Sequence, residues 1–254
     1  VWGISDKNLF LEANEVLSKQ QKPFFAIIQT ADNHRPYNIP EEDTAEFKAP
    51  QWPTDSLLKY GFESQKEYTA FHYMDFCFRK FMEAASKQPY FNNTIFVFVG
   101  DHGVDGNALH IYPPAWTEQR LSDEHVPLLF YAPGFLPTEW HNETVSQIDV
   151  LPTIAGMMQE PYLNTTLGRD LLNEVPKEPA AFIIYHAPGW IGVVNDQYFY
   201  RKNIRIKKDE LVPVKFGLPA LSKQQEDSVK QHLSTLTSAY YETARWMLVN
   251  NGNH

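Results

Sequence analysis

The 254-residue sequence contains a single cysteine, Cys77, so an internal disulfide is excluded. One cysteine is compatible with a reducing compartment and equally with a Gram-negative periplasm, so it does not place the protein. Cys77 lies within a stripe of apolar residues at helical spacing, which favours a position in the core over a reactive thiol.

Long apolar runs and an excess of basic residues are also missing. No run approaches the roughly 18 residues that a membrane span requires, and Val1 does not begin a signal peptide. The net charge of -9 argues against nucleic acid as a partner, because domains that bind the phosphate backbone carry clustered Lys and Arg. The one dense basic stretch, "RKNIRIKK" at 201–208, has hairpin spacing and indicates a solvated strand face. Since Val1 is not a start methionine, we expect a piece of a longer protein.

What the sequence does contain is a pattern of alternating helices and strands. Fully apolar short runs at 23–30, 94–99 and 126–131 predict buried strands, and the polar, proline-rich stretch 31–55 predicts a long loop. Amphipathic patterns predict helices, which fall at 5–20, 63–87 and 146–158. Apolar strands between amphipathic helices favour an α/β fold with a mainly parallel sheet covered by helices on both faces.

The last third of the sequence has a different character. The stretches 180–186 and 190–203 predict consecutive antiparallel strands, with a turn at Asn195-Asp196, and 222–250 predicts a terminal helix. No Gly/Ser-rich linker separates this part from the rest. We therefore expect one domain, with an α/β part at 1–175 and a small antiparallel subdomain at 176–254.

The clearest candidate for chemistry is "FVFVGDHGVDG" at 96–106, where an apolar strand gives way to Asp101 and His102 between glycines. Adjacent side chains on a regular strand point to opposite faces, so these two share a target only where the strand ends and Gly103 frees the backbone to turn. A carboxylate beside a neutral imidazole suits a divalent cation such as Zn²⁺ or Mn²⁺. The alternative is structural, with Asp101 capping the turn and His102 packed.

A second polar cluster, Asp32 with His34 and Arg35, follows the strand predicted at 23–30. Because the carboxyl ends of parallel strands meet at one edge of a sheet, we expect this cluster to lie near Asp101 and His102. His34 and Arg35 are donors suited to an anionic tetrahedral group. Alternatively, Arg35 pairs with an acidic residue that follows it, namely Glu41, Glu42 or Asp43.

Two further histidines, His110 and His125, flank the segment after Asp101-His102 and could fold back over the site. His125 precedes its strand, however, and would lie at the opposite edge if that strand were parallel. No residue stands in a pattern that would activate it as a nucleophile, although Thr30, Thr94 and Ser122 are candidates by type.

Four stretches occur in an order that resembles the sulfatase branch of the alkaline phosphatase superfamily: "PFFAIIQTADNHRPYNIP", "YFNNTIFVFVGDHG", "EHVPLLFYAPG" and "SQIDVLPTIAGMMQEPYLNTTLGRDLL". They are most similar to the lipoteichoic-acid-synthase-type sulfatase domains, which are phosphoglycerol transferases and their relatives. The resemblance covers about residues 1–175, and its "GDHG" and "IDVLPT…GRDLL" elements are specific to the superfamily. Residues 176–254 carry no motif that can be assigned.

The resemblance implies that Asp101 and His102 are ligands of one divalent metal ion (Mn, Zn, Mg or Ca). It also implies that His34 contacts the substrate head group and that His125 lies near the site. In that family the nucleophile (Thr in the transferases, a modified Cys or Ser in the sulfatases) and an acidic ligand come from a region upstream. The resemblance therefore implies a C-terminal fragment without its nucleophile, inactive alone. Cys77 is followed by "FRKF" and lacks the Pro-x-Arg context of a sulfatase nucleophile.

The expected function is a metal-dependent hydrolase or transferase acting on phosphate or sulfate esters, with phosphoglycerol transfer or phosphodiester chemistry favoured over sulfate hydrolysis. The substrate would be lipid-linked or polymeric. Relatives are often membrane-anchored, which implies an extracytoplasmic (periplasmic or cell-surface) domain of a bacterial inner-membrane protein. The alternative is an inert domain that binds an anionic envelope polymer or a protein partner.

Overall fold

The computed structural model describes residues 3–174 and 178–250. The described chain divides into two compact units, and each is treated by itself below. Unit 1 comprises Val1–Gly100, Val104–His110 and Pro127–Thr138, and unit 2 comprises Asp101–Gly103, Ile111–Val126 and Glu139–His254. The boundary predicted between residues 175 and 176 lies outside the described residues and stays a prediction.

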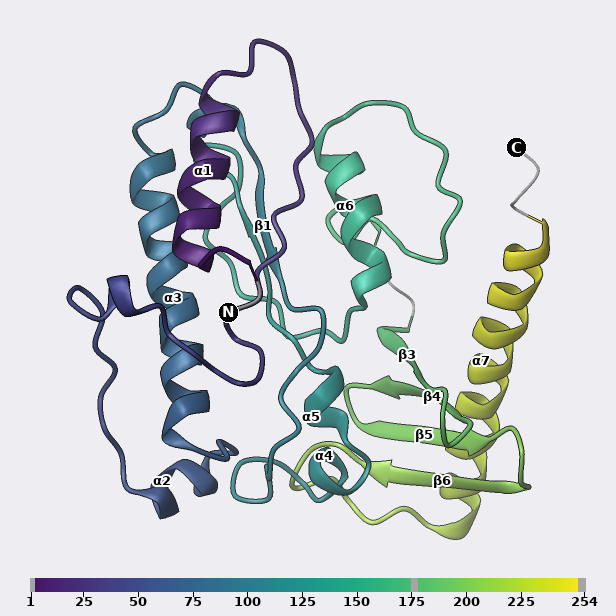
Figure 1. Cartoon of the computed structure of the whole chain (residues 1–254). Helices are drawn as coiled ribbons and strands as arrows, with labels where there is room; N and C mark the ends of the chain where they lie inside the picture. Colours follow the sequence, from purple (N-terminus) through teal and green to yellow (C-terminus); the bar gives the residue numbers. More distant parts are fainter. Residues whose placement is uncertain (1–2, 175–177, 251–254) are drawn as a thin grey trace. The chain divides into compact units, whose positions relative to one another are not determined.

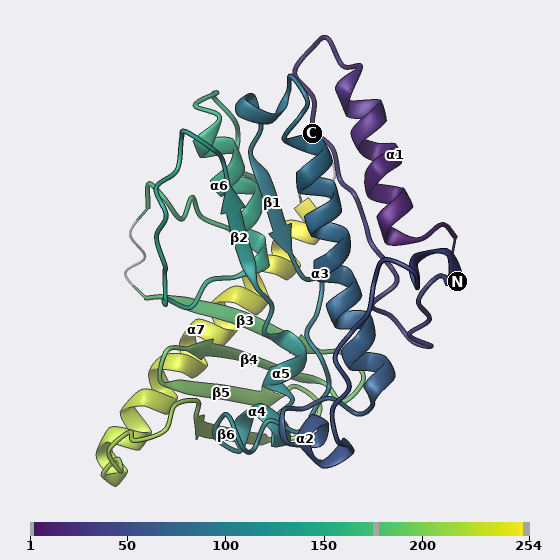
Figure 2. The same cartoon turned by 90° about the vertical axis from the view of Figure 1, so that its left-hand side faces the viewer.

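The centre of unit 1 is a pair of helices that lie side by side, α1 (Asp6–Ser18) and α3 (Gln65–Ala85) (Figure 2). Each begins at a serine whose hydroxyl accepts a backbone N–H three residues later, at 3.2 Å in both cases, which satisfies one of the free donors of the first turn. Both predicted helices are confirmed.

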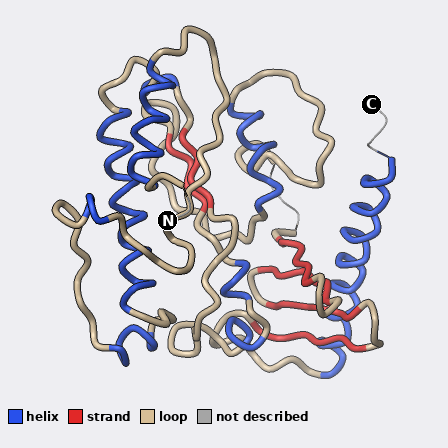
Figure 3. Tube along the Cα trace, viewed as in Figure 1, coloured by secondary structure: helices blue, strands red, loops and turns tan. Residues whose placement is uncertain are grey.

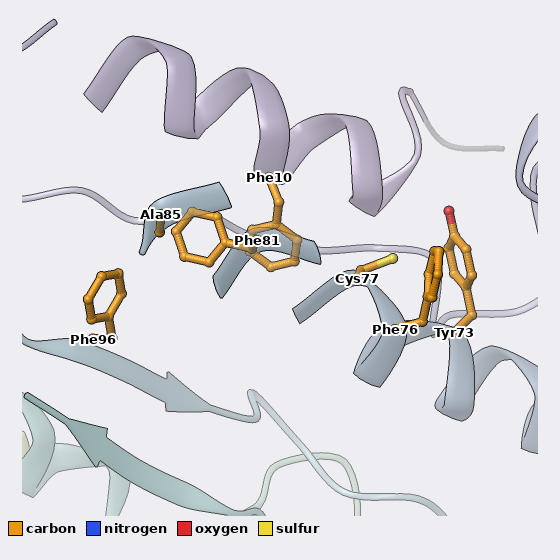
Figure 4. Packing of buried hydrophobic residues seen from close by; sticks show 7 residues of the cluster. All are labelled: Phe10, Tyr73, Phe76, Cys77, Phe81, Ala85 and Phe96. Atoms are coloured by element: carbon orange, nitrogen blue, oxygen red, sulfur yellow. The ribbon is translucent and has the colours of Figure 1, made fainter. Parts of the chain in front are cut away.

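The two helices enclose an aromatic core. Its buried members are Phe10, Tyr73, Phe76, Cys77, Phe81, Ala85 and Phe96 (Figure 4). The ring of Phe10 reaches from α1 to the ring of Phe81, with 5.0 Å between the centroids. The side chain of Cys77 is fully buried here, and burial raises the pKa of its thiol to about 12. The predicted core position of Cys77 is therefore confirmed.

The remaining elements of unit 1 are short. The stretch predicted as a long loop is mostly loop, interrupted by the 3-10 turn η1 (Glu41–Asp43) and the start of α2 (Thr54–Lys59) (Figure 3). A second 3-10 turn, η2 (Phe91–Asn93), leads into β1 (Phe96–Val99).

The two strands of unit 1, β1 and β2 (Leu128–Tyr131), pair in antiparallel register with Phe96 opposite Tyr131 and Val99 opposite Leu128. The parallel arrangement expected for these strands is thus wrong. A parallel pair needs a crossover connection, usually a full helix. The chain instead returns through the helices α4 (Ala115–Glu118) and α5 (Leu121–Glu124), each of which has four residues. As a result, β1 ends and β2 begins at the same end of the ladder.

The strand predicted at 23–30 is also wrong. These residues are irregular, and no strand within 3–174 or 178–250 pairs with them. Phe25 is 66% exposed and Ile27 is 81% exposed. Apolar composition favours a strand only where a hydrogen-bonding neighbour is available, and here the described residues supply none.

Unit 2 contains an antiparallel sheet in the order β3-β4-β5-β6. Its strands are β3 (Ala180–Tyr185), β4 (Trp190–Asn195), β5 (Tyr198–Asn203) and β6 (Lys208–Pro213). The predicted turn is confirmed, because Asn195 Oδ1 accepts the backbone N–H of Gln197 at 2.9 Å and of Tyr198 at 2.8 Å.

The long helix α7 (Lys223–Asn250) packs on one face of this sheet (Figure 1). Leu233 is buried against Val193 and Tyr200, which face it from neighbouring strands. The predicted meander and terminal helix are therefore both present. The other face of the sheet contacts α4 (Ala115–Glu118) and α5 (Leu121–Glu124), whose Ala115 and Leu121 join a second buried cluster.

The "IDVLPT…GRDLL" stretch of unit 2 forms a network of hydrogen bonds around η3 (Gln147–Asp149) and α6 (Val150–Met157). The carboxylate of Asp149 accepts the backbone N–H groups of Ser146 and Arg169, both at 2.9 Å. The hydroxyl of Thr153 donates to the carbonyl of Asp149 at 2.6 Å and accepts the N–H of Leu171 at 3.0 Å. The side chains of Asp149 and Thr153 therefore bind backbone groups of this stretch and have a structural role.

Candidate functional site

The Asp101-His102 turn belongs to unit 2, and both side chains are exposed. Asp101 Oδ1 accepts the backbone N–H of His102 at 2.9 Å. His102 Nδ1 lies 2.8 Å from the carbonyl oxygen of Gly103. A carbonyl can only accept, so the assigned tautomer carries its proton on Nδ1 and leaves the lone pair on Nε2. A histidine that binds metal through Nε2 is held in this way by a carbonyl at Nδ1.

Gly103 allows this turn to lie against the next segment of unit 2. Its N–H donates to the carbonyl of Asp123 at 2.6 Å, and a Cβ on Gly103 would lie 2.0 Å from the carbonyl oxygen of Ser122. The glycine is therefore required for close approach of two backbones. On the other side, Gln147 Nε2 donates to the carbonyl of Asp101 at 3.0 Å.

His125 lies in the same unit, directly after α5. Its ring and that of Trp116 form a T-shaped pair, with 5.1 Å between centroids, and burial lowers the pKa of the imidazole. His125 is therefore neutral at pH 7. A position of His125 at the opposite edge of the sheet was expected only for a parallel strand, and β1 and β2 are antiparallel.

Sequence reasoning missed the acidic neighbours of His102. Burial raises the pKa of Glu124, the charge of Asp123 raises it further, and the charges of Arg120 and His102 oppose both effects. Arg120 donates to Asp123 Oδ2 from Nε at 2.9 Å and from Nη2 at 2.5 Å. The run "SDEH" at 122–125 was the available signal, but only the fold brings it beside the turn.

The other predicted site residues, His34, Arg35 and His110, belong to unit 1 and are exposed. Arg35 Nη2 pairs with Glu63 Oε2 at 2.6 Å, so the alternative of an acidic partner for Arg35 is correct in kind, but the partner is not Glu41, Glu42 or Asp43. His34 Nδ1 lies 2.9 Å from the carbonyl oxygen of Arg35. The structure thus brings Asp101, His102 and His125 into one unit and His34, Arg35 and His110 into the other.

The acidic residues that were expected near Arg35 have structural partners. Asp43 is buried, accepts a hydrogen bond from the hydroxyl of Tyr73 and forms an ion pair with Lys7. Asp32 is also buried and accepts the backbone N–H of Asp6 at 2.7 Å, while Asp6 accepts the N–H of Asp32 at 2.9 Å. This reciprocal pair ties the start of α1 to the predicted substrate cluster.

The donor set of the turn fits a divalent cation in kind, with carboxylate oxygen from Asp101 and imidazole nitrogen from His102. Among the residues that the structure describes, no group of three or more His, Cys, Asp or Glu side chains is arranged to hold a metal ion. Two ligands of the right type are therefore present in the turn, and a complete ligand set within 3–174 and 178–250 is not.

Of the nucleophile candidates, Thr94 donates its hydroxyl to the carbonyl of Tyr90 at 2.7 Å, which is a structural bond. The hydroxyl oxygen of Ser122 is buried. None of the described helices is long and apolar enough to cross a membrane.

Comparison with known proteins gives the family. Residues 1–160 match the family described as Sulfatase. Lipoteichoic acid synthase 1 of Bacillus subtilis is 26% identical over 251 residues, which covers 94% of this chain and 36% of that protein. Lipoteichoic acid synthase of Staphylococcus aureus (strain USA300) is 24% identical over 185 residues, with 68% and 26% covered. The chain thus spans about a third or less of the length of these relatives.

Solved structures show the same fold. A protein of the alkaline phosphatase superfamily from Vibrio parahaemolyticus has a TM-score of 0.63 at 23% identity, with 95% of this chain and 56% of that chain covered. The structure of Ps i-CgsB has a TM-score of 0.68 at 19% identity, with 95% and 54% covered. The expected alkaline phosphatase/sulfatase-like fold is therefore confirmed. With more than half of its length matched, and with the "GDHG" turn built as described above, the chain belongs to the sulfatase family.

Proposed function

We propose that this chain carries part of the active site of a metal-dependent enzyme that hydrolyses or transfers phosphate or sulfate esters. The observation that supports this most directly is the Asp101-His102 turn, which presents a carboxylate and an imidazole Nε2 lone pair while its backbone is bound on both sides. Phosphoglycerol transfer or phosphodiester cleavage is favoured over sulfate hydrolysis, because the similar relatives cited above are named lipoteichoic acid synthases.

In this proposal Asp101 and His102 hold one divalent ion (Mn, Zn, Mg or Ca). When bound, the ion supplies Lewis-acid polarisation of an ester oxygen. His125, neutral at pH 7, offers a hydrogen-bond donor or acceptor to the substrate. His34, Arg35 and His110 are proposed substrate-binding residues, and the ion pair of Arg35 with Glu63 fixes the direction of the guanidinium.

We further propose that the nucleophile and the remaining metal ligand come from residues outside this sequence. Unit 1 supports this, because Phe25, Ile27 and Leu129 are 66%, 81% and 54% exposed in segments with the apolar composition of buried strands. In the whole protein, we propose an extracytoplasmic domain anchored in a bacterial inner membrane, acting on a lipid-linked or polymeric substrate. The boundary near residue 175 belongs to the same proposal.

The test is carried out in the natural protein that contains this sequence, with Asp101→Asn and His102→Gln. Matched controls are Asp55→Asn and His141→Gln, which change exposed residues of the same types elsewhere. We expect both site variants to lose bound metal and to lower turnover of a phosphodiester substrate at least about 100-fold, since a metal ligand is removed. Neither control should change metal content or turnover.

Turnover of a phosphodiester and of a sulfate ester, measured side by side, decides between the two chemistries. A wild-type protein that contains no divalent metal and cleaves neither ester would refute the enzymatic proposal. Retained binding of an anionic polymer by Asp101→Asn in such a protein would instead support the inert, polymer-binding alternative. Full turnover by Asp101→Asn would refute the site assignment alone.

A further inference from the structure

The sheet β3–β6 has no assigned motif, yet it supports the segment that holds the Asp101-His102 turn. Side chains from three strands or their ends form one buried cluster with α4 and α5: Ala115, Leu121, Ile183, Phe199 and Val214. Trp116 of α4 adds a polar tie, because its Nε1–H donates to the carbonyl of Val214 at 2.9 Å. All of these residues lie in unit 2 together with the turn itself.

Tyr185, the last residue of β3, makes a polar contact with the corner between α4 and α5. Its hydroxyl lies 3.1 Å from the carbonyl oxygen of Gln119 and 3.3 Å from that of Arg120, so its single proton is shared between two acceptors. Burial raises the pKa of Tyr185 well above its usual range, so the hydroxyl remains a donor throughout the physiological range.

The corner that Tyr185 binds has an unusual backbone. Arg120 has a φ of 59°, in the left-handed region that residues other than glycine rarely adopt, and it immediately precedes α5. Such a conformation persists only where surrounding contacts hold it. The shared hydrogen bond from Tyr185 is one such contact, and the ion pair between Arg120 and Asp123 is another.

From this corner the contacts lead directly to the turn. Helix α5 follows Arg120, and the carbonyl of Asp123 within it accepts the N–H of Gly103 at 2.6 Å. Gly103 in turn provides the carbonyl that fixes the His102 ring through Nδ1. A shift of α5 would therefore move the acceptor that holds the backbone next to both proposed ligands.

We propose that Tyr185 is a positioning residue for the Asp101-His102 turn, and that the C-terminal sheet serves to hold α5 where the turn needs it. This inference rests on the proposed function, because it concerns how the proposed metal ligands are oriented. It gives a role to residues that the sulfatase motifs do not explain. Removal of a group that orients metal ligands without binding the metal itself typically weakens metal affinity about 10- to 100-fold.

The test uses Tyr185→Phe in the natural protein that contains this sequence. This change removes the hydroxyl and keeps the ring, which packs against the buried cluster that includes Ala115 and Leu121. The matched control is Tyr200→Phe in the same sheet, which removes a hydroxyl bonded to Asp209 Oδ2 at 3.2 Å. The side chain of Tyr200 packs toward α7 and not toward α5. Two quantities are measured, the dissociation constant of Mn²⁺ and the hydrogen-exchange rate of the Gly103 amide.

We expect Tyr185→Phe to weaken Mn²⁺ binding about 10-fold and to speed exchange at Gly103, while Tyr200→Phe changes each by less than about twofold. The melting temperatures of both variants are also measured. If Tyr185 had only a structural role, two variants with similar melting temperatures would also bind Mn²⁺ with similar affinity. Equal Mn²⁺ affinity in wild type and Tyr185→Phe would overturn the inference and leave the proposed function standing. Failure of the wild-type protein to bind Mn²⁺ and every other divalent ion tried would overturn the proposed function, and this inference with it.

Discussion

Replacement of Asp149 by alanine should be among the most destabilising single changes in unit 2. The side chain is 1% exposed, and its two carboxylate oxygens accept the backbone N–H groups of Ser146 and Arg169, both at 2.9 Å. The Arg169 guanidinium adds a longer contact, with Nη2 at 3.3 Å from Oδ2. Alanine would leave both backbone donors without their acceptor and the guanidinium without its buried counter-charge.

The distances indicate which of these losses dominates. A hydrogen bond to a charged group contributes about 1.5–3 kcal/mol, so two backbone bonds of ordinary length together account for about 3–6 kcal/mol. The contact to Nη2 is near the limit of a hydrogen bond, and the Arg169 side chain is 21% exposed, so water partly replaces it. We expect Arg169→Ala to cost only about 0.5–1.5 kcal/mol.

Urea unfolding followed by circular dichroism gives the free energy of unfolding for wild type, Asp149→Ala, Arg169→Ala and the double variant. Asp149→Asn adds a graded case, because its amide keeps one acceptor and should cost about half as much as alanine. If Arg169→Ala costs as much as Asp149→Ala, the ion pair carries the stability and the argument from backbone capping is refuted.

Two further changes have definite expected outcomes. Burial raises the pKa of Asp6 and of Asp32, and the negative charge of Asp6 raises that of Asp32 further. The stability that the protonated forms provide is therefore complete below about pH 4 and is lost as the pH rises through the raised pKa values. Asp32→Asn keeps an acceptor for the Asp6 N–H and removes the like charge, so urea unfolding at pH 4 to 7 should show a smaller loss than in wild type; an equal or steeper loss would contradict the assignment. Cys77, with a pKa of about 12, should not react with a thiol reagent at pH 8 until the protein is unfolded, and rapid labelling of the native protein would show that the core of unit 1 opens.

The helices could be predicted from the sequence because their signals are local. Ser5 and Ser64 accept N–H groups three residues away, and the apolar stripe that includes Phe81 repeats at helical spacing. The same holds for the hairpin at Asn195, whose side chain bonds to its own turn. In each case the atoms that decide the structure lie within a few residues of one another.

Strand pairing could not be predicted in this way, because it depends on partners distant in the sequence. The runs at 94–99 and 126–131 both form strands, but their composition carries no information on direction, and the pairing is antiparallel. The run at 23–30 has the same composition and forms no strand, since the described residues offer it no neighbour. Apolar content thus identified candidate strands, and only the two runs that pair with each other became strands.

The candidate site shows the same division between local and distant information. The Asp101-His102 turn could be proposed from eleven consecutive letters, because a strand end followed by a carboxylate, an imidazole and a glycine is a local pattern. What holds the turn in place is not local. The acceptor for Gly103 lies in α5, the donor to Asp101 is Gln147, and the support of α5 is Tyr185. None of these three residue types at these positions forms a recognisable pattern.

The residues of the two motifs differ in whether folding leaves their polar atoms exposed or buries them in hydrogen bonds. In "GDHG", the exposed side chains of Asp101 and His102 bond to the backbone of the turn through Oδ1 and Nδ1, and Asp101 Oδ2 and His102 Nε2 are the atoms proposed to bind metal. Gly103 is required for close packing. In "IDVLPT…GRDLL", the polar atoms of Asp149 and Thr153 are buried and engaged with the backbone. A residue type that recurs in a motif therefore indicates chemistry only if its polar atoms are left available after folding. By that criterion Asp101 and His102 are the motif residues to test for metal binding, and Asp149 is the one to test for stability.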